Sequence, residues 1–306
     1  MSGLDIEAGE ESSSSNLLGP RSFTWCSEDG LTLAGVHWPV ATHSNQLPVL
    51  CLPGLSRNSR DFDAIARHLQ QSGVAVYALD YRGRGRSDWD PKWENYTIAV
   101  EGTDIDAAIS HLKLERFALL GTSRGGLHAM AMAHRYDNTR MPAVILNDIG
   151  PDIPLASLLR IRDSVGQKMR FESWDHLTNH LKAGLGAQFP ALDQTDWLRF
   201  AHQLASERDG HVVLDYDPAL RHQLDGFEDH DIFPDLWPVL DGLKDRKLLI
   251  LRGQHSDLLS EETLTQMIER HTDTDSLTIP TEGHAPLLWD NSSQQAITRL
   301  LKSSAD

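Results

Sequence analysis

The sequence predicts an α/β fold, in which a mostly parallel central sheet carries helices on both faces. Two observations support this prediction. Short apolar runs alternate with helical patterns along most of the chain, and several of these runs are apolar throughout, as in strands buried on both sides. The length of 306 residues, with 40% hydrophobic and 24% charged residues, suits one globular domain that contains an insertion.

The first half of the chain shows this alternation clearly. Residues 1–20 are acidic and rich in serine, so we expect a flexible tail there. Strand patterns follow at 22–27, 31–38, 49–52, 74–79, 117–120 and 143–146, and helical patterns lie at 61–72, 95–112 and 127–134. Parallel strands joined by helices are the expected arrangement.

The block 152–231 interrupts the alternation. Its clearest patterns are helical, at 155–165, 174–185 and 196–206, and we expect no buried strand in it. Strand patterns return at 247–251 and 276–279, with helical patterns at 261–270 and 286–302. We therefore expect a core made of residues 21–151 and 232–306, with a helical cap inserted between two strands of its sheet.

Composition and charge exclude several classes of protein. The formal net charge of -16 argues against a nucleic-acid partner or an anionic membrane, because both would repel the chain. Cys26 and Cys51 are the only cysteines, so no disulfide framework is expected. The chain shows no basic and apolar leader and no apolar stretch of transmembrane length, and a cytoplasmic location is the expectation.

The segment around Ser123 is the most informative part of the sequence. An apolar run ends at Gly121-Thr-Ser-Arg-Gly125, and a helical pattern follows. A serine at a sharp turn between a strand and a helix projects its hydroxyl into a cleft, and glycines two positions away avoid a collision. The N–H groups that begin the helix point toward a developing oxyanion. The alternative is a glycine-rich structural turn with an incidental serine.

Candidate partners for Ser123 follow later strands. A serine hydroxyl needs a base to take its proton, and the base needs a carboxylate to orient it. Asp257 and His284 each lie just past a predicted strand, and the carboxyl ends of parallel strands meet at one edge of a sheet. We predict Ser123 as nucleophile, His284 as base and Asp257 as acid. Asp148 also follows a strand and is the alternative acid, or else a carboxylate that organises its own loop.

These motifs resemble those of the α/β-hydrolase superfamily, in its capped esterase- and lactonase-like branch, over residues 21–302. The chain order of serine, acid and histidine is also the order in that superfamily. One departure is Pro53-Gly54, where members often have His-Gly. The resemblance is carried by Pro53-Gly54-Leu55, Asp80-Tyr-Arg-Gly-Arg-Gly-Arg-Ser87, Gly121-Thr-Ser-Arg-Gly125, Asn147-Asp-Ile-Gly-Pro151, Gly253-Gln-His-Ser-Asp257 and Gly283-His284.

The resemblance implies a hydrolase that cleaves a small carboxylic ester or lactone through an acyl-enzyme on Ser123. It implies an oxyanion hole made by the backbone N–H groups of Leu55 and Arg124, and no metal or organic cofactor. We expect the Arg124 side chain to pair with an acidic neighbour rather than to face the pocket. Trp174 and Trp197, inside the block 152–231, either line an apolar substrate pocket or form the small core of the cap.

Other functions stay open on the same residues. A hydrolase of carbon–carbon bonds or a cofactor-free perhydrolase would use the same triad, and a non-catalytic small-molecule receptor would keep only the fold. A fluorophosphonate probe separates an enzyme from a receptor whose serine is blocked. The sequence leaves the acyl chain length, the alcohol and the oligomeric state open.

Overall fold

A central eight-stranded sheet organises the protein. The computed structural model describes residues 18–41, 45–226 and 234–304, so most of the predicted tail lies outside the described residues. Within this sheet, as far as the described residues show, the first strand pairs antiparallel with the second and the second with β4, and all other pairs are parallel, which confirms the mostly parallel sheet. Across the sheet the order is β1 (Arg21–Cys26), β2 (Thr32–Trp38), β4 (Val76–Asp80), β3 (Val49–Leu52), β5 (Ala118–Thr122), β6 (Ala143–Asn147), β10 (Lys247–Gly253) and β11 (Thr274–Ile279).

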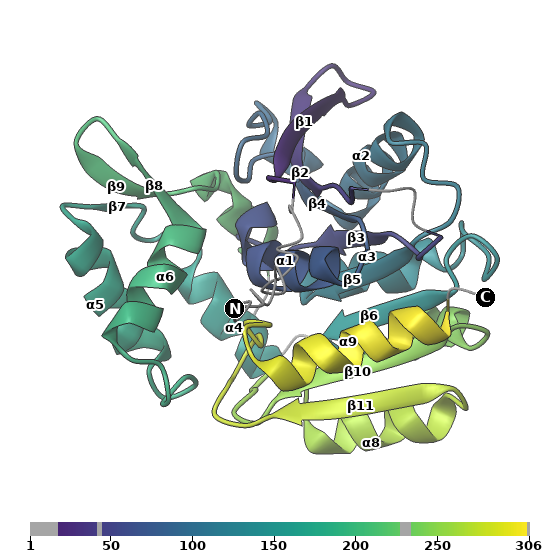
Figure 1. Cartoon of the computed structure of the whole chain (residues 1–306). Helices are drawn as coiled ribbons and strands as arrows, with labels where there is room; N and C mark the ends of the chain where they lie inside the picture. Colours follow the sequence, from purple (N-terminus) through teal and green to yellow (C-terminus); the bar gives the residue numbers. More distant parts are fainter. Residues whose placement is uncertain (1–17, 42–44, 227–233, 305–306) are drawn as a thin grey trace, which may run out of the picture.

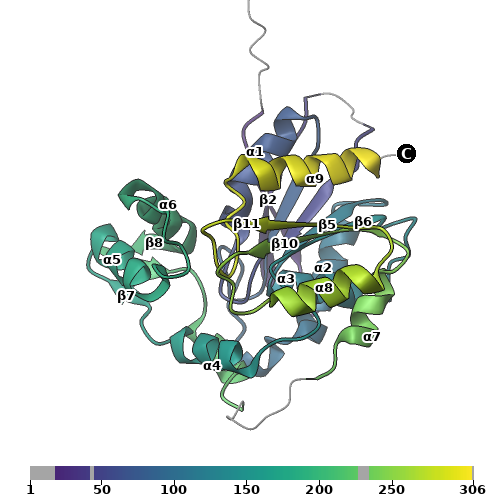
Figure 2. The ribbon, with the colours of Figure 1, turned by 90° about the horizontal axis from the view of Figure 1, so that it is seen from below.

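Helices cover both faces of this sheet, as Figures 1 and 2 show. One face carries α1 (Asp63–Gln71) and α9 (Asn291–Ser303), and the other carries α2 (Ile98–His111), α3 (Arg124–Met132) and α8 (Glu261–Arg270). Successive strand residues therefore enter different cores: Val49 and Cys51 pack with α1 and α9, whereas Leu50 and Leu52 pack with α2 and α3. Burial on both sides explains the uninterrupted apolar runs.

Short helical segments complete the connections of the core. The predicted last helix at 286–302 begins later, at Asn291, because the Asp290 side chain accepts the backbone N–H of Ser293 at 2.8 Å and so caps the helix there. No helix among the described residues is both long and apolar enough to cross a membrane. The short segments are η1 (Ser59–Phe62), η2 (Trp93–Asn95), α7 (Trp237–Leu240) and η4 (Asp241–Leu243).

A separate group of elements, at the left of Figure 1, lies between β6 and β10 in the chain; we call residues 155–223 the insertion. Its helices match the prediction, but the insertion is not purely helical, since the short and only partly buried strands β7, β9 and β8 form a small antiparallel sheet. The insertion contains α4 (Leu155–Ser164), β7 (Arg170–Phe171), α5 (Trp174–Leu185), α6 (Gln194–Leu204), β8 (Ala205–Arg208), β9 (His211–Leu214) and η3 (Pro218–Gln223).

The missed hairpin has a local cause. Its turn is Asp209-Gly210, with φ of 50° and 71°, and Asp-Gly is a favoured pair for a two-residue hairpin turn. The strands have two to four residues each, too few to show a period. The predicted helix 196–206 consequently ends at Leu204, because Ala205 already has extended backbone angles.

Candidate active site

Ser123 occupies the turn between β5 and α3. Its φ is 51°, an unusual value for a residue with a side chain, and it directly precedes the first helical residue. A Cβ on Gly125 would lie 2.0 Å from the Leu52 carbonyl oxygen, and one on Gly121 would lie 2.3 Å from the Gly125 carbonyl oxygen. The close approach expected from the glycine spacing is therefore present.

His284 meets Ser123 across the carboxyl edge of the sheet. It follows β11, and its Nε2 lies 2.9 Å from the Ser123 Oγ. The backbone N–H of His284 donates to the side-chain oxygen of Gln188, in the insertion, at 2.9 Å. The imidazole is 10% exposed, so it is held between the core and the insertion with little access to water.

Asp148 is the carboxylate in contact with His284. Its Oδ2 lies 2.8 Å from the His284 Nδ1, and its side chain is fully buried just after β6. The Ser256 hydroxyl donates to the same oxygen at 2.6 Å, and the Gly253 N–H donates to the other oxygen at 2.8 Å. A carboxylate with these donors holds a proton on Nδ1 and leaves Nε2 free to accept the serine proton.

The sequence-based choice of Asp257 is corrected by this geometry. Asp257 forms an ion pair with Arg160, with Nε at 2.5 Å and Nη2 at 2.9 Å, and its side chain is 37% exposed. Both aspartates follow strands, but β10 lies between β6 and β11 in the sheet. The last residue of β10, Gly253, and Ser256 in the loop after it both donate hydrogen bonds to Asp148. The sequence-based prediction therefore identified a chain segment that belongs to the site but selected the wrong carboxylate.

Several contacts of the site had no signal in the sequence. Gln188 and Ser256 are ordinary polar residues, and only the folded chain brings them to His284 and Asp148. Asp148 itself has a φ of 59°, a backbone conformation that aspartate tolerates better than most residues. That conformation belongs to the turn after β6, and a turn residue leaves no periodic pattern in the sequence from which its role could be predicted.

A cavity of about 160 Å³ opens beside Ser123 and His284. It lies between the core loop at Gly54 and Leu55 and the insertion, which contributes Phe200 among others. A second cavity of about 430 Å³ has a largely apolar lining from the insertion. The two cavities share the lining residues Ser56, Arg57, Ser164, Val165 and Leu185.

Neither tryptophan named from the sequence lines the cavity at Ser123. Trp197 is 1% exposed and packs in the small core of the insertion with Phe189 and Phe200. Trp174 lies against His202, with 3.8 Å between ring centroids, and its Nε1 donates to Glu207 at 2.6 Å. Of the two alternatives, the structure contradicts the pocket and supports the small core, because both rings pack against neighbours within the insertion.

The Arg124 side chain turns away from the cavity, as expected. Its Nε lies 2.7 Å from the Glu101 carboxylate, and its Nη2 donates to the Tyr96 carbonyl oxygen at 2.9 Å. Among the described residues, neither the backbone N–H of Arg124 nor that of Leu55 donates a hydrogen bond to another main-chain group. Two main-chain donors near Ser123 are thus left available for a ligand oxygen.

A second carboxyl group lies close to the histidine loop. Glu282 is 9% exposed and accepts the backbone N–H of Leu287 at 2.7 Å. Burial raises the pKa of Glu282 from 4.5 to about 7, and the nearby carboxylates Asp290 and Asp148 add to the rise. The described residues contain no group of three or more His, Cys, Asp or Glu side chains that could hold a metal ion.

The chain is similar to known proteins in both sequence and fold. The family model described as the α/β-hydrolase fold matches residues 48–170. The chain is 29% identical to a 3-hydroxybutyrate-oligomer hydrolase of Cupriavidus necator, over 81% of this chain and 85% of that protein. It is 37% identical to an α/β hydrolase of Novosphingobium aromaticivorans with a solved structure, at a TM-score of 0.86, over 92% of this chain and 98% of the other. The protein therefore belongs to the α/β-hydrolase superfamily.

Proposed function

We propose that the protein is a serine hydrolase of small carboxylic esters, with Ser123 as nucleophile, His284 as base and Asp148 as the acid that orients the histidine. The observation that carries the proposal is the continuous contact from serine to carboxylate, 2.9 Å from Oγ to Nε2 and 2.8 Å from Nδ1 to Oδ2. Nucleophile, base and orienting group in hydrogen-bond contact are the signature of covalent acyl transfer.

The mechanism follows from the direction of these contacts. The His284 Nε2 takes the proton of Ser123 as the hydroxyl attacks the ester carbonyl, and Asp148 stabilises the imidazolium that forms. The N–H groups of Leu55 and Arg124 are the proposed donors to the oxyanion. His284 then protonates the leaving alcohol and activates a water molecule, which hydrolyses the acyl-enzyme on Ser123.

The substrate that we propose is a linear ester of a short hydroxy acid. The cavity beside Ser123 is small, about 160 Å³, and suits a short group next to the scissile bond. The adjoining cavity of about 430 Å³ offers room for the remainder of a longer substrate. The relative from Cupriavidus necator is called a hydrolase of 3-hydroxybutyrate oligomers, whose units are joined by ester bonds, which supports this choice.

The test is covalent labelling combined with a substrate panel. A fluorophosphonate should form an adduct on Ser123, located by peptide mass spectrometry, and Ser123→Ala should lose roughly 10⁵-fold or more in kcat while it stays folded. Activated esters, lactones, hydroxy acid dimers and a ring-cleavage diketo acid should be compared side by side. An adduct on another residue, or normal turnover by Ser123→Ala, would exclude the proposal.

A further inference from the structure

Glu101 is a buried carboxylate that the proposed reaction does not use. It lies on α2 with none of its side chain exposed. One oxygen lies 2.7 Å from the Arg84 Nη1, and the other lies 2.7 Å from the Arg124 Nε and 3.0 Å from the His128 Nε2. A carboxylate in this position costs a large desolvation free energy, which two guanidinium groups offset.

The first of these contacts leads to Leu55. The Arg84 side chain is also fully buried, between the rings of Tyr81 and Tyr96, and its Nε donates to the Leu55 carbonyl oxygen at 2.8 Å. The carbonyl and the N–H of one residue are separated only by φ and ψ. A guanidinium fixed on the carbonyl therefore restricts the direction of the Leu55 N–H.

The second contact leads to Arg124. Its guanidinium is held between Glu101 and the Tyr96 carbonyl oxygen, and its backbone N–H follows directly on Ser123. One carboxylate is thus linked to both residues whose N–H groups are the proposed oxyanion donors, although Leu55 and Arg124 lie far apart in sequence. No second carboxylate joins these two residues among the described salt bridges.

The charge state of Glu101 fits this arrangement. Burial alone would raise the pKa of its carboxyl, but the Arg124 and Arg84 guanidinium groups hold that pKa well below its usual range. Burial lowers the pKa of His128, so its imidazole is neutral and donates Nε2–H to the carboxylate.

We infer that Glu101 is a positioning residue, which aligns the two oxyanion donors through Arg84 and Arg124. The inference rests on the proposed function, because it assumes that the Leu55 and Arg124 N–H groups receive the oxyanion. An oxyanion hole acts through donors that are already aligned, and loss of one donor typically costs about 10²- to 10³-fold in kcat. Misalignment of both donors should therefore reduce kcat and leave substrate binding nearly unchanged.

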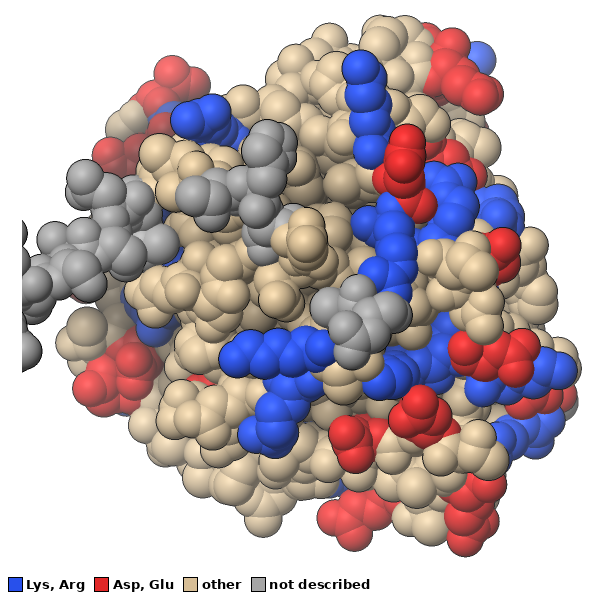
Figure 3. All heavy atoms as spheres, turned by 45° about the vertical axis from the view of Figure 1, so that its right-hand side comes forward, with Lys and Arg blue, Asp and Glu red and all other residues tan. Residues whose placement is uncertain are grey.

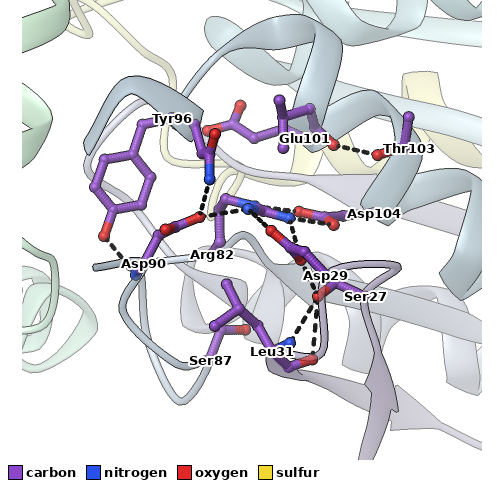
Figure 4. A network of polar contacts seen from close by, with 12 residues as sticks. Ser27, Asp29, Leu31, Arg82, Ser87, Asp90, Tyr96, Glu101, Thr103 and Asp104 are labelled. Carbon is purple, nitrogen blue, oxygen red and sulfur yellow. Dashed lines mark hydrogen bonds and ion pairs between the residues drawn. The ribbon is translucent and has the colours of Figure 1, made fainter. Parts of the chain in front are cut away.

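Asp104 provides a matched control on the same helix. It is one turn after Glu101, it is also buried, and it pairs with Arg82 at 2.7 Å. Figure 4 shows Arg82 surrounded by Asp29, Asp90 and Asp104, with Glu101 nearby on α2. Among the described residues, no hydrogen bond or ion pair joins a side chain of that cluster to Leu55 or Arg124; the link to Arg84 is through the Arg82 main chain, whose carbonyl oxygen accepts the Arg84 Nη1 at 2.6 Å. Asp104→Asn thus removes the charge of a buried, ion-paired carboxylate on the same helix, and it changes no direct contact of Leu55 or Arg124.

The experiment compares Glu101→Gln with Asp104→Asn in the full chain, using a short activated ester. We expect Glu101→Gln to lower kcat roughly 10- to 100-fold with KM within about threefold. Its affinity for a trifluoromethyl ketone, which forms an oxyanion on the nucleophilic serine, should fall by the same factor as kcat/KM. Asp104→Asn should lose comparable stability in urea and keep kcat within about threefold.

A second variant covers the case in which Glu101→Gln does not fold. Arg84→Lys keeps a positive charge beside Glu101 but has no Nε to donate to the Leu55 carbonyl, and it should show the same loss of kcat. Equal kcat in the Glu101, Arg84 and Asp104 variants, or a loss confined to KM, would overturn the inference. Normal activity in Ser123→Ala would instead overturn the proposed function, so the two failures are distinguishable.

Discussion

At the residue scale, Asp148 and Asp257 differ in what surrounds their carboxylates. Asp148 is fully buried and accepts from His284, Ser256 and a backbone N–H, whereas Asp257 is partly exposed beside Arg160. An exposed ion pair contributes little to stability, and a buried carboxylate on an imidazole controls its tautomer. Position after a strand is common to both residues, so burial and contact decide between them.

The first prediction follows from this difference. Asp148→Asn should lower kcat by roughly 10³- to 10⁴-fold, because an amide in this position favours the wrong histidine tautomer. Asp257→Asn should change kcat by less than about threefold. Steady-state kinetics with a short ester, with circular dichroism to verify folding, measures both. A severe loss in the Asp257 variant with a mild loss in the Asp148 variant would restore the sequence-based choice.

A second prediction concerns pH and Glu282. Its pKa in the folded state is about 7 instead of 4.5, so the folded protein binds this proton more tightly than the unfolded chain. The stabilisation is complete below about pH 4.5 and is lost as the pH rises through 7. At about 1.4 kcal/mol per pKa unit, the loss amounts to at most about 3 kcal/mol.

Glu282→Gln isolates this effect, since the amide oxygen can still accept the Leu287 N–H but does not titrate. Urea unfolding between pH 4.5 and 7.5 should show that wild type loses stability relative to the glutamine variant as the pH rises. Parallel curves for the two proteins across this range would contradict the assignment of a raised pKa.

At the element scale, the turn between β5 and α3 depends on close contact between backbones. Gly125 lies against β3 and Gly121 lies against the first turn of α3, so neither position has room for a methyl group. The turn also holds Ser123 at a positive φ, a strained conformation that the surrounding strands maintain. Local sequence pattern and tertiary packing agree at this element, which explains why the sequence predicted it so well.

The third prediction tests this packing. Gly125→Ala should lower the free energy of unfolding by about 3 kcal/mol or more, because its Cβ would lie 2.0 Å from the Leu52 carbonyl oxygen. Gly184→Ala is the control: it lies inside α5 with open space around it, and should stabilise by about 0.5–1 kcal/mol. Urea unfolding measures both. Equal stability of the two variants would show that the turn tolerates rearrangement.

At the scale of the whole molecule, the insertion and the core together form the two cavities near Ser123. Core residues such as Leu55 line one side, and insertion residues such as Phe200 line the other. We propose that the insertion acts as a lid that sets substrate size, because it excludes water and supplies apolar contacts beyond the scissile bond. The predicted boundary of this cap, 152–231, encloses all of these elements, although residues 227–231 lie outside the described part.

The fourth prediction tests whether a substrate extends from one cavity into the other, past the lining residues that they share. Ser164 ends α4 and lines both of them. Ser164→Phe should reduce kcat/KM by about tenfold or more for an ester with a long chain, and should leave a short acetate ester within about threefold. The acetate ester serves as the internal control for folding and chemistry. Equal proportional loss on both substrates would count against a continuous substrate channel.

Charge is also distributed at this scale. On the face shown in Figure 3, Lys and Arg side chains gather in a band, although the chain has a formal net charge of -16. A shallow hollow of about 870 Å³, lined by Arg116, Arg246 and Lys247 among others, lies at the amino ends of β6 and β10. Arg246 and Lys247 donate there to the carbonyl oxygens of Tyr136 and Ser303. These two cations therefore have main-chain carbonyl oxygens as partners, and they lie at the edge of the sheet opposite to Ser123.

The sequence by itself determined the α/β fold, the turn at Ser123 and the pairing with His284. These features depend on local information: apolar periods, glycines two residues from a serine, and a histidine just after a strand. The hairpin of β8 and β9 was not predicted from the sequence, because strands of four residues show no reliable period, although Asp209-Gly210 is a typical pair for a hairpin turn.

Tertiary structure alone decided which carboxylate contacts His284, which residues line the cavity and what Glu101 joins. The physical reason is that each of these depends on neighbours brought together from distant strands. The loop after β10 contains Ser256, whose hydroxyl donates to Asp148, and it does not supply the carboxylate that contacts His284. The backbone of Leu55 is held by Arg84. Hydrogen bonds and burial of this kind are set by the order of strands in the sheet, which no local pattern along the chain contains.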